Sequence, residues 1–183
     1  KPVDVDTRTV PLNASVNIPL SVLFSELDTE AAVRMNTSVG NIDIVLQPTL
    51  TPQTYANFMA YANDPDSADN YIGAAFHRVS PGFVVQGGGY KPLTAEGADK
   101  FAEVTRKTSP VNEPGISNVA GTVSMAKGSG VNSATHDFFF NLDDNSELDT
   151  VANNSFTAFG RVAGNGMSTT VQSIVNLPGK KYT

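Results

Sequence analysis

Hydrophobic and polar positions alternate most clearly just after residue 30. Val33 and Met35 alternate with polar neighbours, and Ile42 and Ile44 do so again after the polar turn at 38–41. Two runs of period two that are separated by a short turn are typical of a β-hairpin. We therefore expect the folded region to open with two antiparallel strands.

A period of 3.6 residues replaces the alternation directly afterwards. Thr51 and Pro52 suit an N-cap and the first position of a helix. Apolar residues then recur at the spacing i, i+3, i+4 and i+7, at Tyr55, Phe58, Met59 and Ala62. This pattern predicts an amphipathic helix that ends before Asp64 and Pro65.

Short apolar runs separated by turn-rich segments make up most of the remaining chain. Strands are expected at 74–79, 83–86, 121–126, 137–142 and 156–162, and a second amphipathic helix is expected at 167–175. Residues 91–115 lack clear periodicity and are expected to form a long loop, which is uncommon without a function. Many strands with only two helices favour a mainly β fold, a closed or nearly closed barrel.

The first 30 residues are expected to form an N-terminal extension (1–30) to a single domain (31–183). Ile18 and Leu20 alternate with polar neighbours, which suits a short strand, although Pro19 weakens that interpretation. We expect an arm that packs on the surface of the barrel.

Composition narrows the class of protein. Of 183 residues, 40% are hydrophobic and 16% are charged, as in a soluble globular domain. No apolar run reaches the roughly 18 residues that span a bilayer. The formal net charge is −6 with no basic run, so we expect no nucleic-acid partner. The absence of cysteine excludes disulfides, thiol catalysis and cysteine zinc sites.

The compartment is less constrained by the sequence. The chain starts at Lys1, which suits a periplasmic or exported protein whose signal has been removed. A trimmed cytoplasmic protein would start in the same way. We expect the first of these, and we expect a monomer.

Most familiar catalytic patterns are missing. The two histidines, His77 and His136, are far apart and lack the spacing of metal ligands. There is no G-x-S-x-G motif, and no Walker lysine follows Gly87–Gly89. The acidic cluster at 143–149 lacks the glycine and the final glutamate of a calcium loop, so we interpret it as a solvated turn. We expect no metal and no cofactor.

One stretch remains, and its sequence is distinctive. Residues 76–88 read FHRVSPGFVVQGG, and GTVSMA (121–126), DFFFN (137–141), LD (148–149) and FGRV (159–162) follow in order. These segments together resemble the cyclophilins, the barrel-fold peptidyl-prolyl cis-trans isomerases, over roughly residues 32–176, and most of all the bacterial ones. The resemblance implies an eight-stranded antiparallel closed barrel capped by two α-helices, which acts on proline-containing polypeptides.

The same resemblance implies a set of site residues. Arg78 is the expected catalytic residue, and the expected substrate-binding residues are Phe83, Val84, Gln86, Ala126, Phe139, Glu147, Leu148 and Phe156. Phe83, Val84, Phe139 and Leu148 would line the proline pocket, while Gln86 and the Ala126 backbone would hold the peptide. His77 is expected to be structural, because on a strand it would face away from both Phe76 and Arg78.

These residue types suit the reaction. Rotation about an X-Pro bond must overcome a barrier of roughly 18–20 kcal/mol, because amide resonance is lost. No bond to another atom is made, so no nucleophile, metal or cofactor is required. A cation that donates a hydrogen bond to the prolyl nitrogen stabilises the twisted amide more than either planar form. Arginine supplies that cation without deprotonating.

The chain also departs from the family pattern. Glu147 stands where the family usually has Trp, or Phe in many bacterial members, and the chain has no Trp. Since cyclosporin binding depends on that indole, we expect weak cyclosporin binding. Val84 replaces a larger Met, Asp137 replaces Gln, and Phe156 removes a polar group near the proline. These changes leave open how active the protein is.

Two alternatives remain beside the isomerase. One is a chaperone-like module of the same fold that binds proline-containing segments with little turnover. The other is a barrel unrelated to proline, in which Arg78 would be buried in a salt bridge with no pocket beside it.

Overall fold

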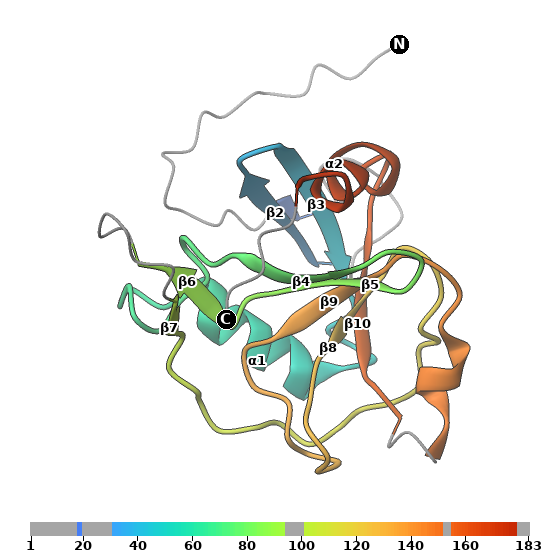
Figure 1. The fold of residues 1–183 in the computed structure, drawn as a ribbon. Coiled ribbons are helices and arrows are strands. Elements are labelled where there is room, and N and C mark those ends of the chain that lie inside the picture. The colour runs from blue at the N-terminus through green and yellow to red at the C-terminus, as the bar shows by residue number, and fades with distance from the viewer. Residues whose placement is uncertain (1–17, 20–30, 94–100, 152–154, 179–183) are drawn as a thin grey trace.

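A computed structural model describes residues 18–19, 31–93, 101–151 and 155–178. Its main sheet is antiparallel, with strand order β1-β2-β3-β10-β8-β9-β5-β4. These strands are β1 Ile18–Pro19, β2 Ala31–Thr37, β3 Gly40–Leu46, β4 Phe76–Ser80, β5 Val84–Gly87, β8 Thr122–Met125, β9 Phe138–Asn141 and β10 Ala158–Val162. Helix α1 (Pro52–Ala62) and helix α2 (Gln172–Val175) lie at opposite ends of the curled sheet (Figure 1).

The mainly β antiparallel class with two helices is confirmed, but the closed eight-stranded barrel is wrong. β1 has only two residues, and within the described residues it does not pair with β4 at the other end of the strand order. The longer seven strands form a curled half-barrel. A helical segment, the π-helical turn η4 (Met167–Val171) followed by α2, contacts β3 through η4 and β4 through α2. Side-chain packing therefore spans the opening that strand pairing leaves.

The opening hairpin and the short strands are confirmed. Val33 pairs with Ile44 and Met35 with Ile42, so the alternating residues share one face. The five later strands differ from the expected ranges by one or two residues at their ends. On the inner face of the sheet, Val85 is opposite Phe140 and Phe140 is opposite Val123. All three are completely buried, and they form the centre of the core.

The first helix begins where the sequence predicts, but a different residue caps it. Thr51 occupies the N-cap position without a side-chain capping bond, and its hydroxyl donates to the carbonyl of Gln47 at 3.0 Å. The carboxylate of Glu113 accepts from the backbone N–H groups of Gln53 and Thr54, at 3.1 and 2.8 Å. A distant acidic residue thus satisfies the free amides and the positive end of the helix dipole.

The expected long loop at 91–115 is partly wrong. Strands β6 (Tyr90–Pro92) and β7 (Phe101–Glu103) pair as a separate two-stranded sheet, and 94–100 lie outside the described residues. Three residues per strand are too few to leave a periodic signal in the sequence. The boundary between an extension (1–30) and a domain (31–183) stays a prediction, since only β1 of the extension is described.

Candidate active site

The arginine of the FHR motif faces outward because β4 contains a bulge. Phe76 is opposite Gly87 and Arg78 is opposite Gln86, so β4 has one more residue, His77, than β5 over this stretch. A bulge of one residue moves the next side chain to the other face of the sheet. Phe76 therefore packs in the core while Arg78 is exposed. The expectation that these two side chains share a face is wrong.

Arg78 is the first residue of a row that crosses the outer face of the sheet. Gln86 is opposite Arg78, Phe139 is opposite Gln86, and Ser124 is opposite Phe139. Residues opposite one another on neighbouring strands lie on the same face. The guanidinium Nη1 of Arg78 donates a hydrogen bond to Oε1 of Gln86 at 3.3 Å. The pairing of β4, β5, β8 and β9 thus brings together three of the expected site residues.

A tight turn places Phe83 beside this row. Pro81 and Gly82 occupy its centre, Gly82 has a φ of +73°, and the N–H of Phe83 donates to the carbonyl of Ser80 at 3.0 Å. A positive φ at the third position after proline at the second is the pattern of a type II turn. Phe83 is half-buried, and Cζ of Arg78 lies 6.0 Å from the centroid of its ring. The cation is therefore held next to an apolar surface.

A pair of aromatic rings lies on the other side of Gln86 from Arg78. The rings of Phe139 and Phe156 meet edge to face with their centroids 6.0 Å apart. Phe139 is only 4% exposed and Phe156 is half-buried, so Phe156 presents the more accessible ring. Nζ of Lys127 lies 4.9 Å from the Phe156 centroid. Position 156, where the resemblance leads us to expect a polar group, thus presents a ring with a cation over it.

The other residues expected in the site differ in their exposure and in the groups that they can offer to a peptide. Val84 is 2% exposed, so it lies beneath the surface rather than on it. Leu148 is half-buried, and its carbonyl accepts from the N–H of Phe156 at 2.8 Å. The N–H of Ala126 donates to the carbonyl of Asp137 at 2.9 Å, which leaves the Ala126 carbonyl as its main-chain group for a peptide. Glu147 is exposed.

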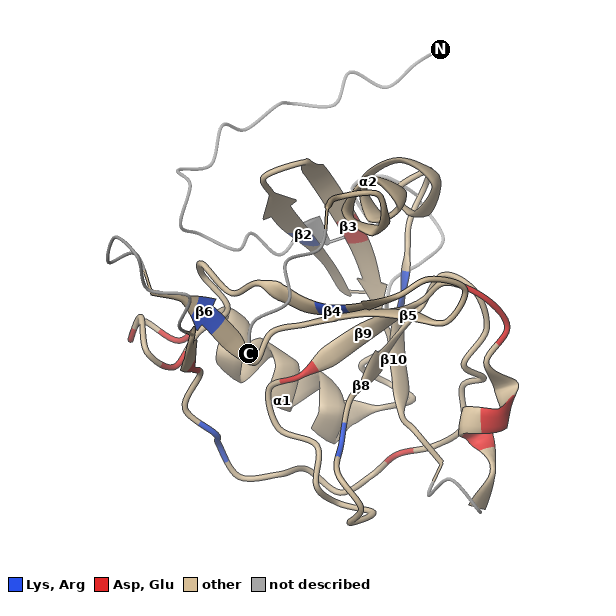
Figure 2. Cartoon of the chain, in the orientation of Figure 1, with Lys and Arg blue, Asp and Glu red and all other residues tan. Residues whose placement is uncertain are grey.

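The acidic residues after β9 fall into two groups, one exposed and one half-buried and hydrogen bonded. Asp143, Asp144 and Glu147 are exposed, and Figure 2 shows acidic residues on the 3₁₀ helix η2 (Ser146–Asp149) and on the turn before it. Asp149 differs, because its carboxylate accepts hydrogen bonds from Ser117 Oγ at 2.5 Å and from the N–H of Asn118 at 3.0 Å. Burial raises the pKa of Asp149, and these hydrogen bonds lower it below its usual range.

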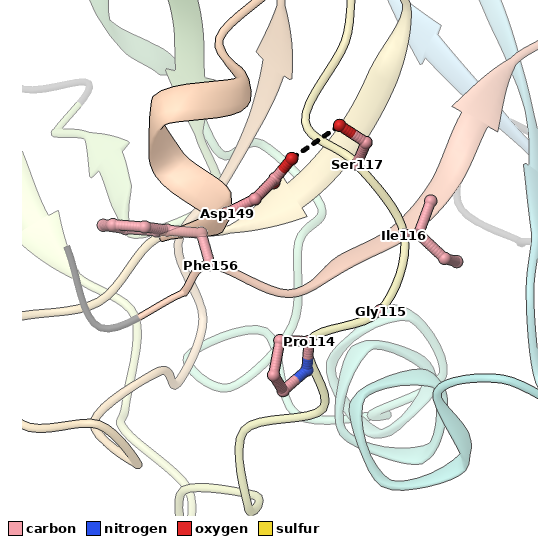
Figure 3. A pocket seen from close by; sticks show the side chains of 6 residues that line it. All are labelled: Pro114, Gly115, Ile116, Ser117, Asp149 and Phe156. Carbon is pink, nitrogen blue, oxygen red and sulfur yellow. Dashed lines mark hydrogen bonds between the residues drawn. The ribbon is translucent and has the colours of Figure 1, made fainter. Parts of the chain in front are cut away.

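A small cavity lies beside the same carboxylate. It has a volume of about 190 Å³, and Figure 3 shows the Asp149–Ser117 hydrogen bond along one side of it. Its lining residues are Pro114, Gly115, Ile116, Ser117, Asp149 and Phe156. Phe156 thus lines this cavity and also belongs to the Phe139–Phe156 pair.

His77 lies against the second sheet. Its ring meets Tyr90 edge to face at 4.8 Å, and its Nε2 lies 3.7 Å from Oδ1 of Asp137. Burial lowers the pKa of His77, while the Asp137 charge partly opposes that shift. A Cβ on Gly89 would collide with the Asp137 carboxylate. The last glycine of the Gly87–Gly89 run therefore makes room for a half-buried carboxylate.

Three asparagines in the site were not expected from the sequence. Asn118, Asn141 and Asn145 are at most 3% exposed, and they hydrogen bond to one another and to the main-chain carbonyls of Phe83 and Phe156. Asparagine is common in turns, so its presence near the strand ends carries no signal of burial. The family resemblance assigned roles only to positions expected to line the pocket, so it did not indicate these asparagines either.

Two further findings concern the described part of the chain. No group of three or more His, Asp or Glu residues there is arranged to hold a metal ion. No helix there is long and apolar enough to cross a membrane.

Comparison with known proteins gives consistent results. The model of the family described as cyclophilin type peptidyl-prolyl cis-trans isomerase/CLD matches residues 32–182. Peptidyl-prolyl cis-trans isomerase A of Dickeya dadantii is 38% identical over 135 residues, which cover 73% of this chain and 66% of that protein. A peptidyl-prolyl cis-trans isomerase of Acinetobacter baylyi is 36% identical over 151 residues, covering 82% and 74%.

Solved structures show the same fold. The crystal structure of a cyclophilin type peptidyl-prolyl cis-trans isomerase of Cryptosporidium parvum superposes with a TM-score of 0.60 at 22% identity, covering 83% of this chain and 88% of that one. A second structure of that protein, in the presence of the dipeptide Ala-Pro, gives a TM-score of 0.59.

Proposed function

The chain belongs to the cyclophilin-type peptidyl-prolyl cis-trans isomerases, and we propose that it accelerates rotation about X-Pro bonds through Arg78 and the apolar surface beside it. The observation that carries this proposal is the place of the guanidinium. It is exposed, it is hydrogen bonded to Gln86, and it lies 6.0 Å from the centroid of the Phe83 ring. A barrel unrelated to proline would instead have this guanidinium buried in a salt bridge, whereas Arg78 is exposed.

The mechanism follows from what happens to the prolyl nitrogen. As the X-Pro amide twists, its nitrogen lone pair localises and becomes a hydrogen-bond acceptor. A guanidinium N–H aimed at that nitrogen stabilises the twisted amide and offers little to the planar forms. Each 1.36 kcal/mol of preferential stabilisation gives about a tenfold rate increase. A charge-assisted hydrogen bond, worth roughly 1.5–3 kcal/mol, would supply one to two powers of ten.

The remaining residues hold the substrate. The Phe83 and Phe156 rings provide an apolar surface on which the prolyl ring can rest. Gln86 holds the guanidinium through its Oε1 and leaves its amide N–H groups for the peptide backbone. The carbonyl of Ala126 is an acceptor for the same backbone. The Ala-Pro dipeptide used with the Cryptosporidium parvum relative is consistent with a substrate of this kind.

A proline-binding module with little turnover is the competing hypothesis. The exposed Arg78 favours catalysis, whereas the carboxylate of Glu147 at the pocket rim favours altered recognition. A protease-coupled assay on an Ala-Pro peptide separates the two. Substoichiometric protein should raise the cis-to-trans rate at least tenfold above the uncatalysed rate. Binding of the peptide without any acceleration would support the module instead.

Further proposals concern cyclosporin affinity, oligomeric state and cellular compartment, which the fold does not determine. We propose weak cyclosporin binding because Glu147 and Phe156 replace groups that the family uses in its pocket. The protein is proposed to be a monomer, which sedimentation velocity tests. It is proposed to be periplasmic or exported, with the cytoplasm as the alternative, and fractionation of cells that express the whole gene decides between them.

A further inference from the structure

The two aromatic side chains that we propose to hold the prolyl ring, called here the Phe83 wall and the Phe156 wall, come from distant parts of the chain. Phe83 follows the β4–β5 turn, and Phe156 precedes β10. Between them lie Asn118, Asn141 and Asn145, whose exposed fractions are 0%, 0% and 3%. A buried amide destabilises a fold unless its donors and acceptors are paired. Whether these three side chains stabilise the fold therefore depends on their hydrogen-bond partners.

The first half of the connection begins at the Phe83 wall. Nδ2 of Asn145 donates to the carbonyl of Phe83 at 2.9 Å and to Oδ1 of Asn141 at 2.8 Å. Nδ2 of Asn141 in turn donates to Oγ1 of Thr122 at 2.9 Å and lies 3.3 Å from Oδ1 of Asn118. The Phe83 main chain is thereby connected to Asn141, the last residue of β9.

The second half ends at the Phe156 wall. Nδ2 of Asn118 donates to the carbonyl of Phe156 at 3.1 Å and to Oδ1 of Asp149 at 2.6 Å. Its Oδ1 accepts from Oγ of Ser124 at 2.6 Å. Asp149 ends η2, the helix that also contains Leu148. An unbroken series of hydrogen bonds therefore runs from the carbonyl of Phe83 to the carbonyl of Phe156.

This series restricts how far apart the walls can stand. Asn118 and Asn141 each use the side-chain oxygen as an acceptor and the nitrogen as a donor, and Asn145 donates twice through its nitrogen, so none of the three can rotate without losing a bond. The surroundings exclude water, which strengthens each bond and makes an unpaired group costly. We propose that Asn118, Asn141 and Asn145 are positioning residues that set the spacing of the Phe83 and Phe156 walls and hence the fit of the prolyl ring. The inference rests on the proposed isomerase function.

Arg78 is outside the series, since its hydrogen-bond partner is Gln86. A substitution that breaks this series of hydrogen bonds should therefore weaken binding of the prolyl ring and leave the guanidinium in place. In kinetic terms, KM should rise while kcat changes little. A residue that only stabilises the fold would lower the unfolding temperature without changing KM.

The test replaces Asn145, the link to the Phe83 wall, in the full chain. Asn145→Ala should raise KM for an Ala-Pro peptide at least fivefold with kcat within about twofold of wild type. Asn145→Ser keeps one donor, so its KM should lie between those of Asn145→Ala and wild type; it also serves if the alanine variant fails to fold. The matched control is Asn57→Ala, which removes a buried amide that donates to Thr135 at 2.7 Å, away from the pocket. The control should lower the unfolding temperature and leave KM unchanged.

The possible outcomes separate the inference from the function on which it rests. If KM for the Asn145 variants stays within twofold of wild type, or if Asn57→Ala raises KM equally, the positioning role is wrong. A wild type that gives no acceleration would overturn the proposed function instead. In that case the positioning role is tested by the Kd of the same peptide, measured by calorimetry. Asn145→Ala should raise this Kd at least fivefold above that of wild type.

Discussion

Glu147 is the residue at which this pocket differs most in charge from the family pattern. It is exposed on η2, next to the half-buried Leu148. Its carboxylate places negative charge where a Trp or Phe ring would offer apolar contact. An aromatic ring that buries fully contributes a few kcal/mol to binding, which a solvated carboxylate cannot replace.

Glu147→Trp should therefore restore part of the cyclosporin site. We expect its affinity for cyclosporin, measured by titration calorimetry, to exceed that of wild type by at least about tenfold, or 1.4 kcal/mol. Glu147→Gln, which removes the charge without adding a ring, is the control and should gain less. Wild-type binding in the low nanomolar range would contradict the proposed effect of Glu147.

Among the elements, the β4–β5 hairpin and the glycines after it determine where the site lies. The bulge at His77 turns Arg78 outward, and Gly89 leaves room for the Asp137 carboxylate. Both features are set by close packing rather than by periodicity. Substitutions in this region should therefore change the free energy of unfolding by amounts that the hydrophobic pattern does not predict.

Gly89→Ala tests the packing argument. Its added Cβ would meet the Asp137 carboxylate, so the side chain or the backbone must shift, at a cost of roughly 1–3 kcal/mol. Gly128→Ala is a matched control, because its Cβ would find Ser133 Oγ at an ordinary 3.7 Å and should change stability by less than about 0.5 kcal/mol. Urea unfolding of both variants gives the comparison. Equal stabilities would show that Asp137 does not need the space.

The hairpin should also make stability depend on pH. Burial lowers the pKa of His77 in the folded state, so the unfolded chain binds the proton more readily. The contribution of neutral His77 is complete above its ordinary pKa of about 6.5 and is lost as pH falls below that value through the folded-state pKa. The unfolding temperature should thus fall between pH 7.5 and pH 5. His77→Asn should show a smaller fall, and an identical profile would exclude His77 as the cause.

At the scale of the whole molecule, the sequence predicts the architecture better than the site. The hairpin of Val33 and Ile44 was predictable because one buried face leaves a period of two. Closure of the barrel was not, because it depends on whether the terminal strands pair or a helix packs between them. The outward turn of Arg78 depends on one extra residue, and the burial of Asn118 depends on contacts with distant segments. Such non-local contacts leave no pattern along the chain.

The division into an extension and a domain gives another prediction at this scale. Only β1 of residues 1–30 is described, and it pairs with β2 at the opposite end of the strand order from β4, the strand that contains Arg78. Residues 31–183 should therefore fold cooperatively by themselves and keep kcat/KM within about twofold of the full chain. Circular dichroism melting and the coupled assay measure both properties. Loss of activity in a folded truncated chain would show that the extension contributes to the site.

The central claim is that the Arg78 guanidinium accelerates prolyl rotation, and kcat/KM of Arg78 variants tests it most directly. In the protease-coupled assay on an Ala-Pro peptide, Arg78→Ala should lower kcat/KM by on the order of 100-fold, since removal of one well-placed donor costs about that much. Arg78→Lys keeps the charge but not the planar fork and should recover only part of the loss. Circular dichroism should show that both variants are folded. If Arg78→Ala and wild type accelerate the reaction equally, or neither exceeds the uncatalysed rate, the claim is wrong.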